Sequence, residues 1–124
     1  MRIEYEYHDR YGIMRPYGII TDWTSDELFS KLVQEVVAEH ISSYEIRNED
    51  VGLLILDGSN FNRVREIGLG ALIAAKKRLI EHDSDLILCS LPDSISHYLD
   101  TTRLRSIYRI FNSAQIGTAL FWIA

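Results

Sequence analysis

The chain has 124 residues, of which 47% are hydrophobic and 25% are charged, and this composition fits one ordinary globular domain. It excludes a disordered chain and a collagen-like repeat, and a chain of this length needs neither a disulfide nor a metal to hold its core. The 13 basic and 18 acidic residues give a net charge of −5, which argues against nucleic acid or an anionic lipid surface as the main partner, because phosphate binding requires a net basic face.

The N-terminal residues predict a β-hairpin. Residues 2–7 alternate polar and apolar side chains, which is the period of a strand with one exposed face. Residues 8–10 predict a turn, and residues 11–20 continue in extended structure. Pro16 restricts this second segment to a sheet edge or a bulge, and Gly18 favours a bend. We expect the two segments to pair as antiparallel strands.

An amphipathic helix is predicted next, over about residues 25–41. Thr24 and Glu27 fit a capping box, in which the Thr24 hydroxyl accepts from a free amide and Glu27 reaches back to the cap. Apolar side chains then recur at spacings of three and four and form one stripe: Leu28, Phe29, Leu32, Val33, Val36 and Val37. Residues 42–50 are polar and acidic, so we expect a loop there.

The following residues predict two buried strands with a helix between them. Residues 51–56 form a continuous apolar run, which is typical of a central parallel strand that is buried on both faces. The apolar period becomes helical near Gly68, and a helix is predicted from there to Glu81. Its inward side chains would be Leu69, Leu72, Ile73, Ala75, Leu79 and Ile80. Residues 85–91 predict the second buried strand.

Three further elements complete the predicted order. They are a short helix over about residues 92–99, a strand over residues 106–111 and a terminal helix over residues 113–123. Residues 1–124 are thus predicted to form a single α/β domain, in which an N-terminal antiparallel hairpin joins a mostly parallel sheet covered by about four helices. Ligands and partners of such sheets meet the loops at the carboxyl ends of the strands.

The single cysteine and the lengths of the apolar runs predict the compartment. Cys89 cannot form an intramolecular disulfide, and its apolar neighbours predict a small buried side chain in a reducing environment. No stretch has the roughly 18 to 20 apolar residues of a membrane span, and the acidic first residues lack the pattern of a signal peptide. We therefore expect a cytoplasmic protein.

No motif of catalysis or of metal binding is present. The four histidines lack metal-ligand spacing, and the chain has no nucleophile elbow, Walker sequence or GxGxxG motif. Asp57 ends a predicted central strand, where an aspartate can accept a phosphoryl group, but such a site needs further acidic residues to hold Mg²⁺. A turn-forming Asp57 is therefore favoured. We expect no enzymatic activity, no cofactor and no metal.

Residues 57–72 carry the most specific motif in the chain. They read Asp-Gly-Ser-Asn-Phe-Asn-Arg-Val-Arg-Glu-Ile-Gly-Leu-Gly-Ala-Leu, which resembles the core signature of the STAS domain, the family of anti-sigma factor antagonists. In that family a buried strand ends in Asp, a loop with an aromatic residue follows, and an Asp-Ser-Ser/Ala-Gly-Leu-Gly motif opens the next helix. The strand-end Asp falls on Asp57, the aromatic on Phe61 and Gly-Leu-Gly on residues 68–70. The resemblance is fainter over residues 1–50.

The chain departs from the family pattern at the start of this helix. Family members that are regulated by phosphorylation place Asp-Ser there, whereas this chain has Arg65 and Glu66. Glu66 occupies the phosphoacceptor position and is no substrate for a serine kinase, although a carboxylate in a first helical turn supplies part of the charge of a phosphoserine. Two interpretations stay open: Glu66 is an ordinary exposed residue in a member that has lost the switch, or it is a fixed mimic of the phosphorylated state.

The resemblance implies a non-enzymatic, protein-binding regulatory domain that lacks the usual serine switch. Its partner would be an anti-sigma factor with a kinase-like fold, and the domain would be a monomer or a weak homodimer without membrane insertion. The alternatives are a scaffold or regulatory subunit of a signalling or transporter complex and a small nucleotide-binding or enzymatic domain on the same topology. We expect the partner to contact Asn62, Arg63, Arg65, Glu66, Ile67, Gly68 and Leu69.

Overall fold

The fold begins with an antiparallel hairpin and continues as a parallel sheet. The structure is a computed structural model that describes residues 1–102 and 109–111. In these residues the strands lie in the order β1 (Arg2–Tyr7), β2 (Tyr11–Tyr17), β3 (Leu53–Asp57), β4 (Leu86–Cys89) and β5 (Arg109–Phe111). β1 and β2 are antiparallel, and every later pair is parallel. The predicted mixed α/β sheet is therefore confirmed, with β3 at its centre as expected.

Pro16 lies inside β2 without disturbing the sheet. β2 pairs with β1 through residues 12–17, but it pairs with β3 only through residues 11–14. Pro16 therefore stands at a locally free edge, which is where the missing amide of a proline costs no sheet hydrogen bond. Gly18 follows with a φ of +136°, so the predicted bend is present.

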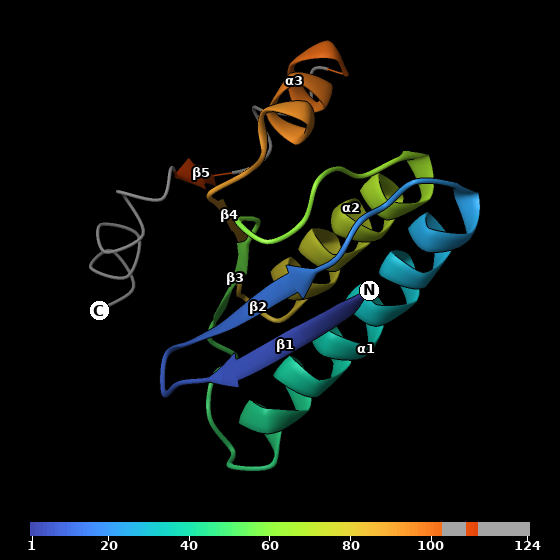
Figure 1. The fold of residues 1–124 in the computed structure, drawn as a ribbon. Coiled ribbons are helices and arrows are strands. Elements are labelled where there is room, and N and C mark those ends of the chain that lie inside the picture. The colour runs from blue at the N-terminus through green and yellow to red at the C-terminus, as the bar shows by residue number, and fades with distance from the viewer. Residues whose placement is uncertain (103–108, 112–124) are drawn as a thin grey trace.

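Three helices lie in the part of the chain that the structure describes: α1 (Trp23–Glu45), α2 (Glu66–Glu81) and α3 (Asp93–Thr101). This is one fewer than the roughly four predicted, because the helix predicted over residues 113–123 lies outside the described residues, as do residues 106–108 of the last predicted strand. α1 and α2 run side by side along one face of the sheet (Figure 1). Among the described helices, none has the length and apolar character needed to span a membrane.

The ends of α1 differ from the sequence prediction. The N-cap is Asp22 and not Thr24: the Asp22 carboxylate accepts from the Ser25 amide at 2.9 Å, and the Ser25 hydroxyl accepts from the Asp22 amide at 3.2 Å. Asp22 and Ser25 have the same three-residue spacing as Thr24 and Glu27, so the local pattern admits both boxes. The helix also continues through Glu45, into the segment predicted as a loop.

Tyr44 explains the longer C-terminal end of α1. Its side chain is buried, and its hydroxyl donates to the carbonyl of His8 at 2.6 Å. The hydroxyls of Ser42 and Ser43 bond to carbonyls one turn earlier, so these polar residues are satisfied within the helix and do not require a loop. The packing of Tyr44 thus determines where α1 ends, whereas the polar composition of this segment alone predicts a loop.

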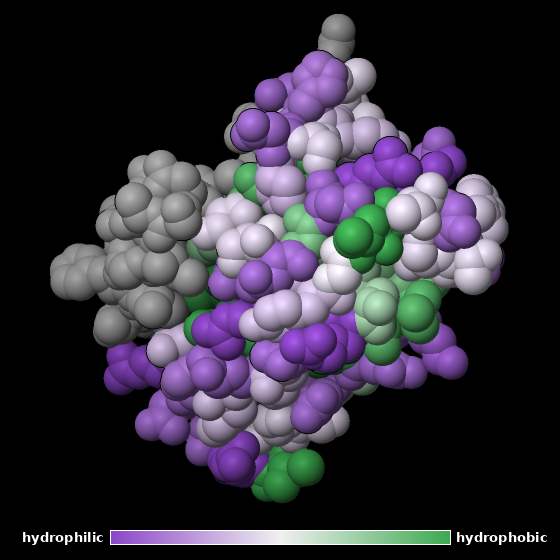
Figure 2. All heavy atoms as spheres, viewed as in Figure 1, coloured by the Kyte–Doolittle hydropathy of each residue, from purple (hydrophilic) through white to green (hydrophobic). Residues whose placement is uncertain are grey.

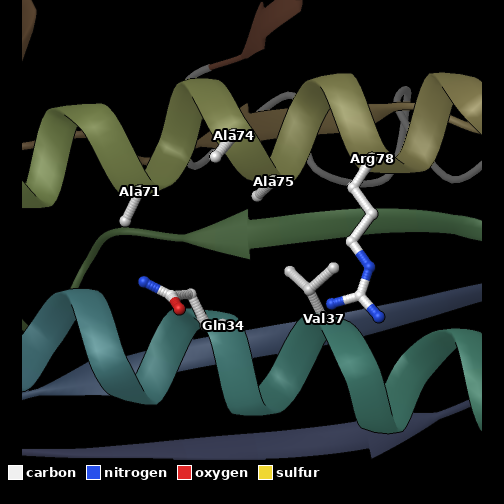
Figure 3. Close-up of a pocket in the computed structure, with 6 residues that line it drawn as sticks. All are labelled: Gln34, Val37, Ala71, Ala74, Ala75 and Arg78. Atoms are coloured by element: carbon white, nitrogen blue, oxygen red, sulfur yellow. The ribbon is translucent and has the colours of Figure 1, made fainter.

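The buried face of α2 is narrower than predicted. Leu69, Leu72, Ala75 and Leu79 are buried, whereas Ile73 and Ile80 are 38% and 52% exposed. α1 packs against the other flank of α2, where the two helices leave a groove of about 310 Å³ (Figure 3). The groove is lined by Gln34, Val37, Ala71, Ala74, Ala75 and Arg78. The two isoleucines point away from that contact, so the prediction that they pack inward was wrong.

The opposite face of the sheet has a smaller apolar cluster. It consists of Ile13, Ile55, Ile87 and Cys89, all of which are buried. Burial raises the pKa of the Cys89 thiol to about 11. Because the thiolate is the reactive form of cysteine, Cys89 behaves as the small hydrophobic residue that its sequence neighbours predict.

A buried histidine connects α1 to the hairpin. His40 Nε2 lies 2.7 Å from the carbonyl oxygen of Gly52, and its Nδ1 lies 2.7 Å from the hydroxyl of Tyr5. A carbonyl can only accept, so Nε2 carries the proton and Nδ1 accepts from Tyr5. Burial lowers the pKa of His40, and the hydrogen bond to Gly52 opposes this in part. The fold therefore requires the neutral ring.

We expect this requirement to make the domain less stable in mild acid. The unfolded chain binds a proton on His40 near pH 6.5, and the folded chain does so only at lower pH. The stabilisation that depends on neutral His40 is thus fully present above about pH 6.5. It falls as the pH drops toward the pKa of His40 in the folded chain, by up to about 1.4 kcal/mol per pH unit. Urea unfolding at a series of pH values should show a smaller loss for His40→Gln, which cannot titrate. Equal losses in the two proteins would contradict this role for His40.

Candidate functional site

Two loops and the first turn of α3 meet at the carboxyl ends of the parallel strands. The β2–α1 loop (residues 18–22) and the β3–α2 loop (residues 58–65) are joined by an amide pair, in which the Asn62 side chain accepts from the Ile20 amide at 2.8 Å and donates to its carbonyl at 3.1 Å. The hydroxyl of Ser94, in the first turn of α3, donates to the carbonyl of Asn62. This is the end of the sheet at which the sequence predicts partner binding.

Arg63 fastens the same two loops together. Its guanidinium donates to the carbonyl of Ile20 at 3.1 Å and to the carbonyl of Thr21 at 3.2 Å. Arg63 is exposed, yet some of the N–H groups of its guanidinium already donate hydrogen bonds within the domain. Asn62 and Arg63 therefore hold the loops in place in addition to any contact with a partner, and local sequence gives no signal for these bonds because the partners lie about forty residues apart.

The middle of the β3–α2 loop is anchored in the core. Phe61 and Val64 are buried, and the ring of Phe61 stacks on Phe29 of α1 with 5.4 Å between the ring centroids. Apolar burial fixes the loop at two points on either side of Asn62 and Arg63. The aromatic residue of the motif is thus a core residue that keeps the loop against α1.

Asp26 of α1 caps the start of α2. Arg65 is the N-cap residue of α2, and its side chain makes no capping hydrogen bond. The fully buried carboxylate of Asp26 accepts instead from the amides of Arg65, Ile67 and Gly68, at 3.0, 3.0 and 3.1 Å. This role of Asp26 was not predicted from the sequence. A signal is present, because Asp26 lies on the buried stripe of α1 three residues before Phe29.

The two glycines of the motif have different surroundings. A Cβ atom on Gly68 would lie 2.6 Å from an oxygen of Asp26 and 2.9 Å from the ring of Phe29, whereas a Cβ on Gly70 would meet nothing within 4 Å. Gly68 therefore permits the close approach of α1 to α2, since no side chain fits there. Gly70 is exposed and leaves open space beside the first turns of α2.

The seven residues expected to contact a partner are not equally accessible. Glu66 is exposed like Arg63, and Asn62, Arg65 and Ile67 are half-buried. Gly68 and Leu69 are buried. The accessible surface at this site is thus formed mainly by the charged side chains and by Ile67.

Two exposed apolar residues, one on the neighbouring β2–α1 loop and one at the start of α1, extend this surface. Ile19 is 67% exposed and Trp23, at the start of α1, is 52% exposed, and hydrophobic side chains gather beside the β2–α1 loop (Figure 2). The hydrogen bonds from Ser25 lower the pKa of the Asp22 carboxyl, and the charge of Arg65 adds to this effect. The charge of Arg65 therefore acts on the end of the β2–α1 loop. Ile19 and Trp23 are not among the predicted contact residues, because the sequence motif that predicted those residues lies in the β3–α2 segment.

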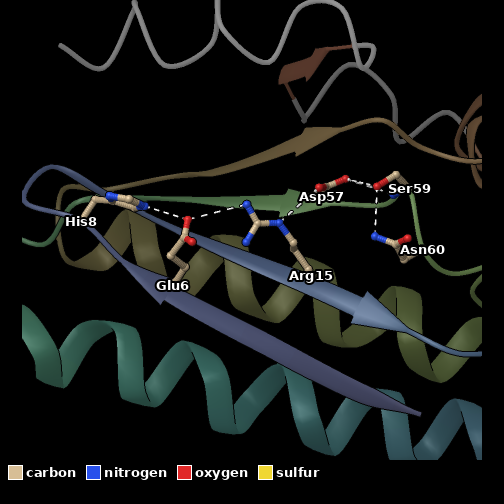
Figure 4. A network of polar contacts seen from close by, with 6 residues as sticks. All are labelled: Glu6, His8, Arg15, Asp57, Ser59 and Asn60. Atoms are coloured by element: carbon tan, nitrogen blue, oxygen red, sulfur yellow. Dashed lines mark hydrogen bonds and ion pairs between the residues drawn. The ribbon is translucent and has the colours of Figure 1, made fainter.

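Asp57 is engaged in a turn and in an ion pair. Its carboxylate accepts from the amide and the hydroxyl of Ser59, at 3.1 and 2.7 Å, and lies 3.5 Å from the guanidinium of Arg15 (Figure 4). Arg15 also lies 3.6 Å from Glu6, whose pKa is lowered chiefly by the hydrogen bond from His8. The turn-forming role expected for Asp57 is confirmed. No group of acidic, histidine or cysteine side chains in the described part of the chain is arranged to hold a metal ion.

Comparison with known proteins assigns the fold and the motif to one family. The model of the STAS domain matches residues 2–115. The chain belongs to the STAS domain family. A comparison with curated protein sequences gives no match. The expected STAS-like fold is thus confirmed over nearly the whole chain.

Solved structures with this fold include several anti-sigma factor antagonists. A Thermotoga maritima protein proposed as an anti-sigma factor antagonist has a TM-score of 0.73 and 19% identity, over 98% of this chain and 93% of its own. An anti-sigma factor antagonist from Mycobacterium paratuberculosis has a TM-score of 0.72 and 17% identity, over 98% and 92%. The anti-sigma factor antagonist SpoIIAA, in its unphosphorylated form, has a TM-score of 0.67 and 11% identity, over 98% of each chain. At these identities the likeness concerns the fold of this STAS domain.

Proposed function

We propose that this STAS domain is a non-enzymatic regulatory module that binds a protein partner through the start of α2 and the adjoining β2–α1 loop. The observation that carries the proposal is the coupling of these two loops by Asn62 and Arg63 beside accessible apolar and charged side chains. Ile19, Trp23 and Ile67 supply apolar area, and Arg65 and Glu66 supply charge. A small apolar area with charges around it suits a specific protein contact, in which the charges set the orientation of the partner.

An anti-sigma factor with a kinase-like fold is the partner class that we propose. The solved structures with the same fold include antagonists of anti-sigma factors, by their own descriptions. The alternatives are a scaffold or regulatory subunit of a signalling or transporter complex, and a small nucleotide-binding or enzymatic domain. The last of these is disfavoured because catalysis requires converging groups, and Asp57 is already engaged by Ser59 and Arg15.

We further propose that the domain works without the serine switch of its phosphorylated relatives. Glu66 occupies the position of the phosphoacceptor in the motif and has no hydroxyl to modify. Its side chain is exposed and makes no hydrogen bond or ion pair with the described residues, so it is available to a partner as a constant negative charge. Such a module has one affinity for its partner, set by the amount of each protein.

The substitution Arg65→Glu tests this surface. It reverses a half-buried charge that makes no side-chain hydrogen bond at the helix start but acts on the nearby Asp22 carboxylate, so folding stability should change by about 1 kcal/mol or less. Capture of the partner from a lysate of the source organism, with mass spectrometry to identify an ATP-binding anti-sigma factor, should decrease at least about tenfold, the effect of losing roughly 1.4 kcal/mol.

Arg78→Glu is the matched control. Arg78 is an exposed arginine on the same helix, in its last turn, and its reversal should leave capture unchanged. If Arg65→Glu retains every partner of the wild type, the interface lies elsewhere. If the captured proteins are components of a signalling or transport complex without an anti-sigma factor, the scaffold function replaces the antagonist function.

A further inference from the structure

The start of α2 is held by one carboxylate that comes from another helix. Asp26 Oδ1 accepts from the amide of Arg65, and Oδ2 accepts from the amides of Ile67 and Gly68. These are among the amides that an α-helix leaves without intrahelical partners at its N-terminus. Both oxygens of Asp26 are thus used, and both are committed to the first turn of α2 and to its N-cap residue.

The surroundings of Asp26 stabilise these hydrogen bonds. The side chain is fully buried, and a buried carboxylate is tolerated only where hydrogen bonds and favourable charge compensate its lost hydration. Three amide donors at the positive end of a helix provide that compensation. The side chain cannot withdraw without leaving a charge unpaired in the core, so the contact has one stable geometry.

Gly68 shows that the two helices are fitted to each other at this point. Its absent side chain leaves the space that the Asp26 oxygen and the Phe29 ring occupy, at 2.6 and 2.9 Å from where a Cβ would lie. The Asp26 oxygens can therefore reach the amides only with a glycine at position 68. Because Oδ1 binds the amide of Arg65, the contact also sets the end of the β3–α2 loop.

We propose that Asp26 is a positioning residue that locks the partner surface in a single conformation, by acting as the resident anion of the α2 N-terminus. The free amides at a helix N-terminus can bind a free or covalently attached phosphate. In α2 these amides already bind the carboxylate of Asp26. The surface is consequently ordered without modification. This inference rests on the proposed function for its effect on binding, and on the contacts of Asp26 alone for the conformational lock.

Amide exchange with Asp26→Asn tests the lock. The substitution keeps the size of the side chain but removes its charge and places an NH₂ group against amide donors. The control is Val33→Ala, which removes a fully buried side chain from the same stripe of α1, two turns further on and away from the start of α2. Exchange of the Ile55 amide, in the central strand, reports global unfolding in each protein.

In Asp26→Asn the amides of Arg65, Ile67 and Gly68 should exchange at least tenfold faster relative to Ile55 than they do in the wild type. In Val33→Ala the exchange rates of these amides relative to Ile55 should stay within twofold of the wild type, even if Val33→Ala lowers the unfolding temperature as much as Asp26→Asn does. If the two variants have equal exchange ratios, the effect of Asp26→Asn is general destabilisation only, and the proposed conformational lock is contradicted.

Partner capture separates the lock from the proposed function. With the partner retained by the wild type and lost by Arg65→Glu, Asp26→Asn should weaken capture at least tenfold at a temperature where it is fully folded, and Val33→Ala should not. Faster exchange with unchanged capture would overturn the positioning role and leave the proposed surface standing. If Arg65→Glu loses no partner, the proposed function fails, and the exchange ratio alone still decides whether Asp26 locks the helix start.

Discussion

Replacing Leu72 with Asp is expected to destabilise this domain by several kcal/mol, the largest loss of stability predicted here for a single substitution. Leu72 is 1% exposed and lies in the main core between α2 and the sheet. The variant would place an unpaired carboxylate in that core and would lose a large apolar side chain, at a cost of at least about 5 kcal/mol. Domains of this size have a stability of roughly 5–15 kcal/mol, so at least about a third of it, and at the lower end all of it, would be lost. Circular dichroism during urea or thermal unfolding measures the effect.

Ile73→Asp is the matched control for this substitution. Ile73 is the next residue of the same helix and is 38% exposed, so its carboxylate can remain hydrated and the loss should be about 1 kcal/mol or less. A collapse of both variants would show that α2 buries a different face. The pair is informative because the sequence pattern alone predicts both residues to point inward.

The order of the elements could be predicted from the sequence because it depends on local periodicity. Alternation over residues 2–7 and the apolar run over residues 51–56 correspond to β1 and β3, with ends shifted by at most two residues. The helical stripe near residue 69 corresponds to α2. Each of these patterns consists of residues that are close in the sequence. The resemblance to the STAS motif then predicts the topology of the sheet.

The errors in the prediction concern interactions with distant parts of the chain. Ile73 and Ile80 belong to a wide apolar arc of α2, and periodicity cannot tell which part of that arc a neighbouring helix covers. The end of α1 depends on the contact between Tyr44 and His8, thirty-six residues earlier. Such contacts are decided by tertiary packing, which overrides local preference.

The candidate site shows the same division. The sequence motif locates the start of α2 and the charges of Arg65 and Glu66, which are local features. It does not reveal that Asp26 caps the helix or that Arg63 binds the β2–α1 loop, because both bonds join backbone and side-chain groups about forty residues apart. An aspartate on a buried helical stripe is the one local sign, since a charge is rarely buried without partners.

Alanine substitutions at Gly68 and Gly70 are expected to change stability in opposite directions. Both residues lie inside α2, where alanine is preferred over glycine by about 1 kcal/mol. Gly70 has open space around it, so Gly70→Ala should stabilise the domain by about 0.5–1 kcal/mol.

At Gly68 the new methyl group would stand 2.6 Å from an oxygen of Asp26 and 2.9 Å from the Phe29 ring, both of which are buried. Either α1 moves away or the carboxylate loses its amide partners, and overpacking together with weakened hydrogen bonds should cost a net of about 2–3 kcal/mol. Urea unfolding of the two variants beside the wild type measures both changes. A stabilising Gly68→Ala would mean that α1 and α2 are not held together at Asp26, and the conformational lock would then lose its structural basis.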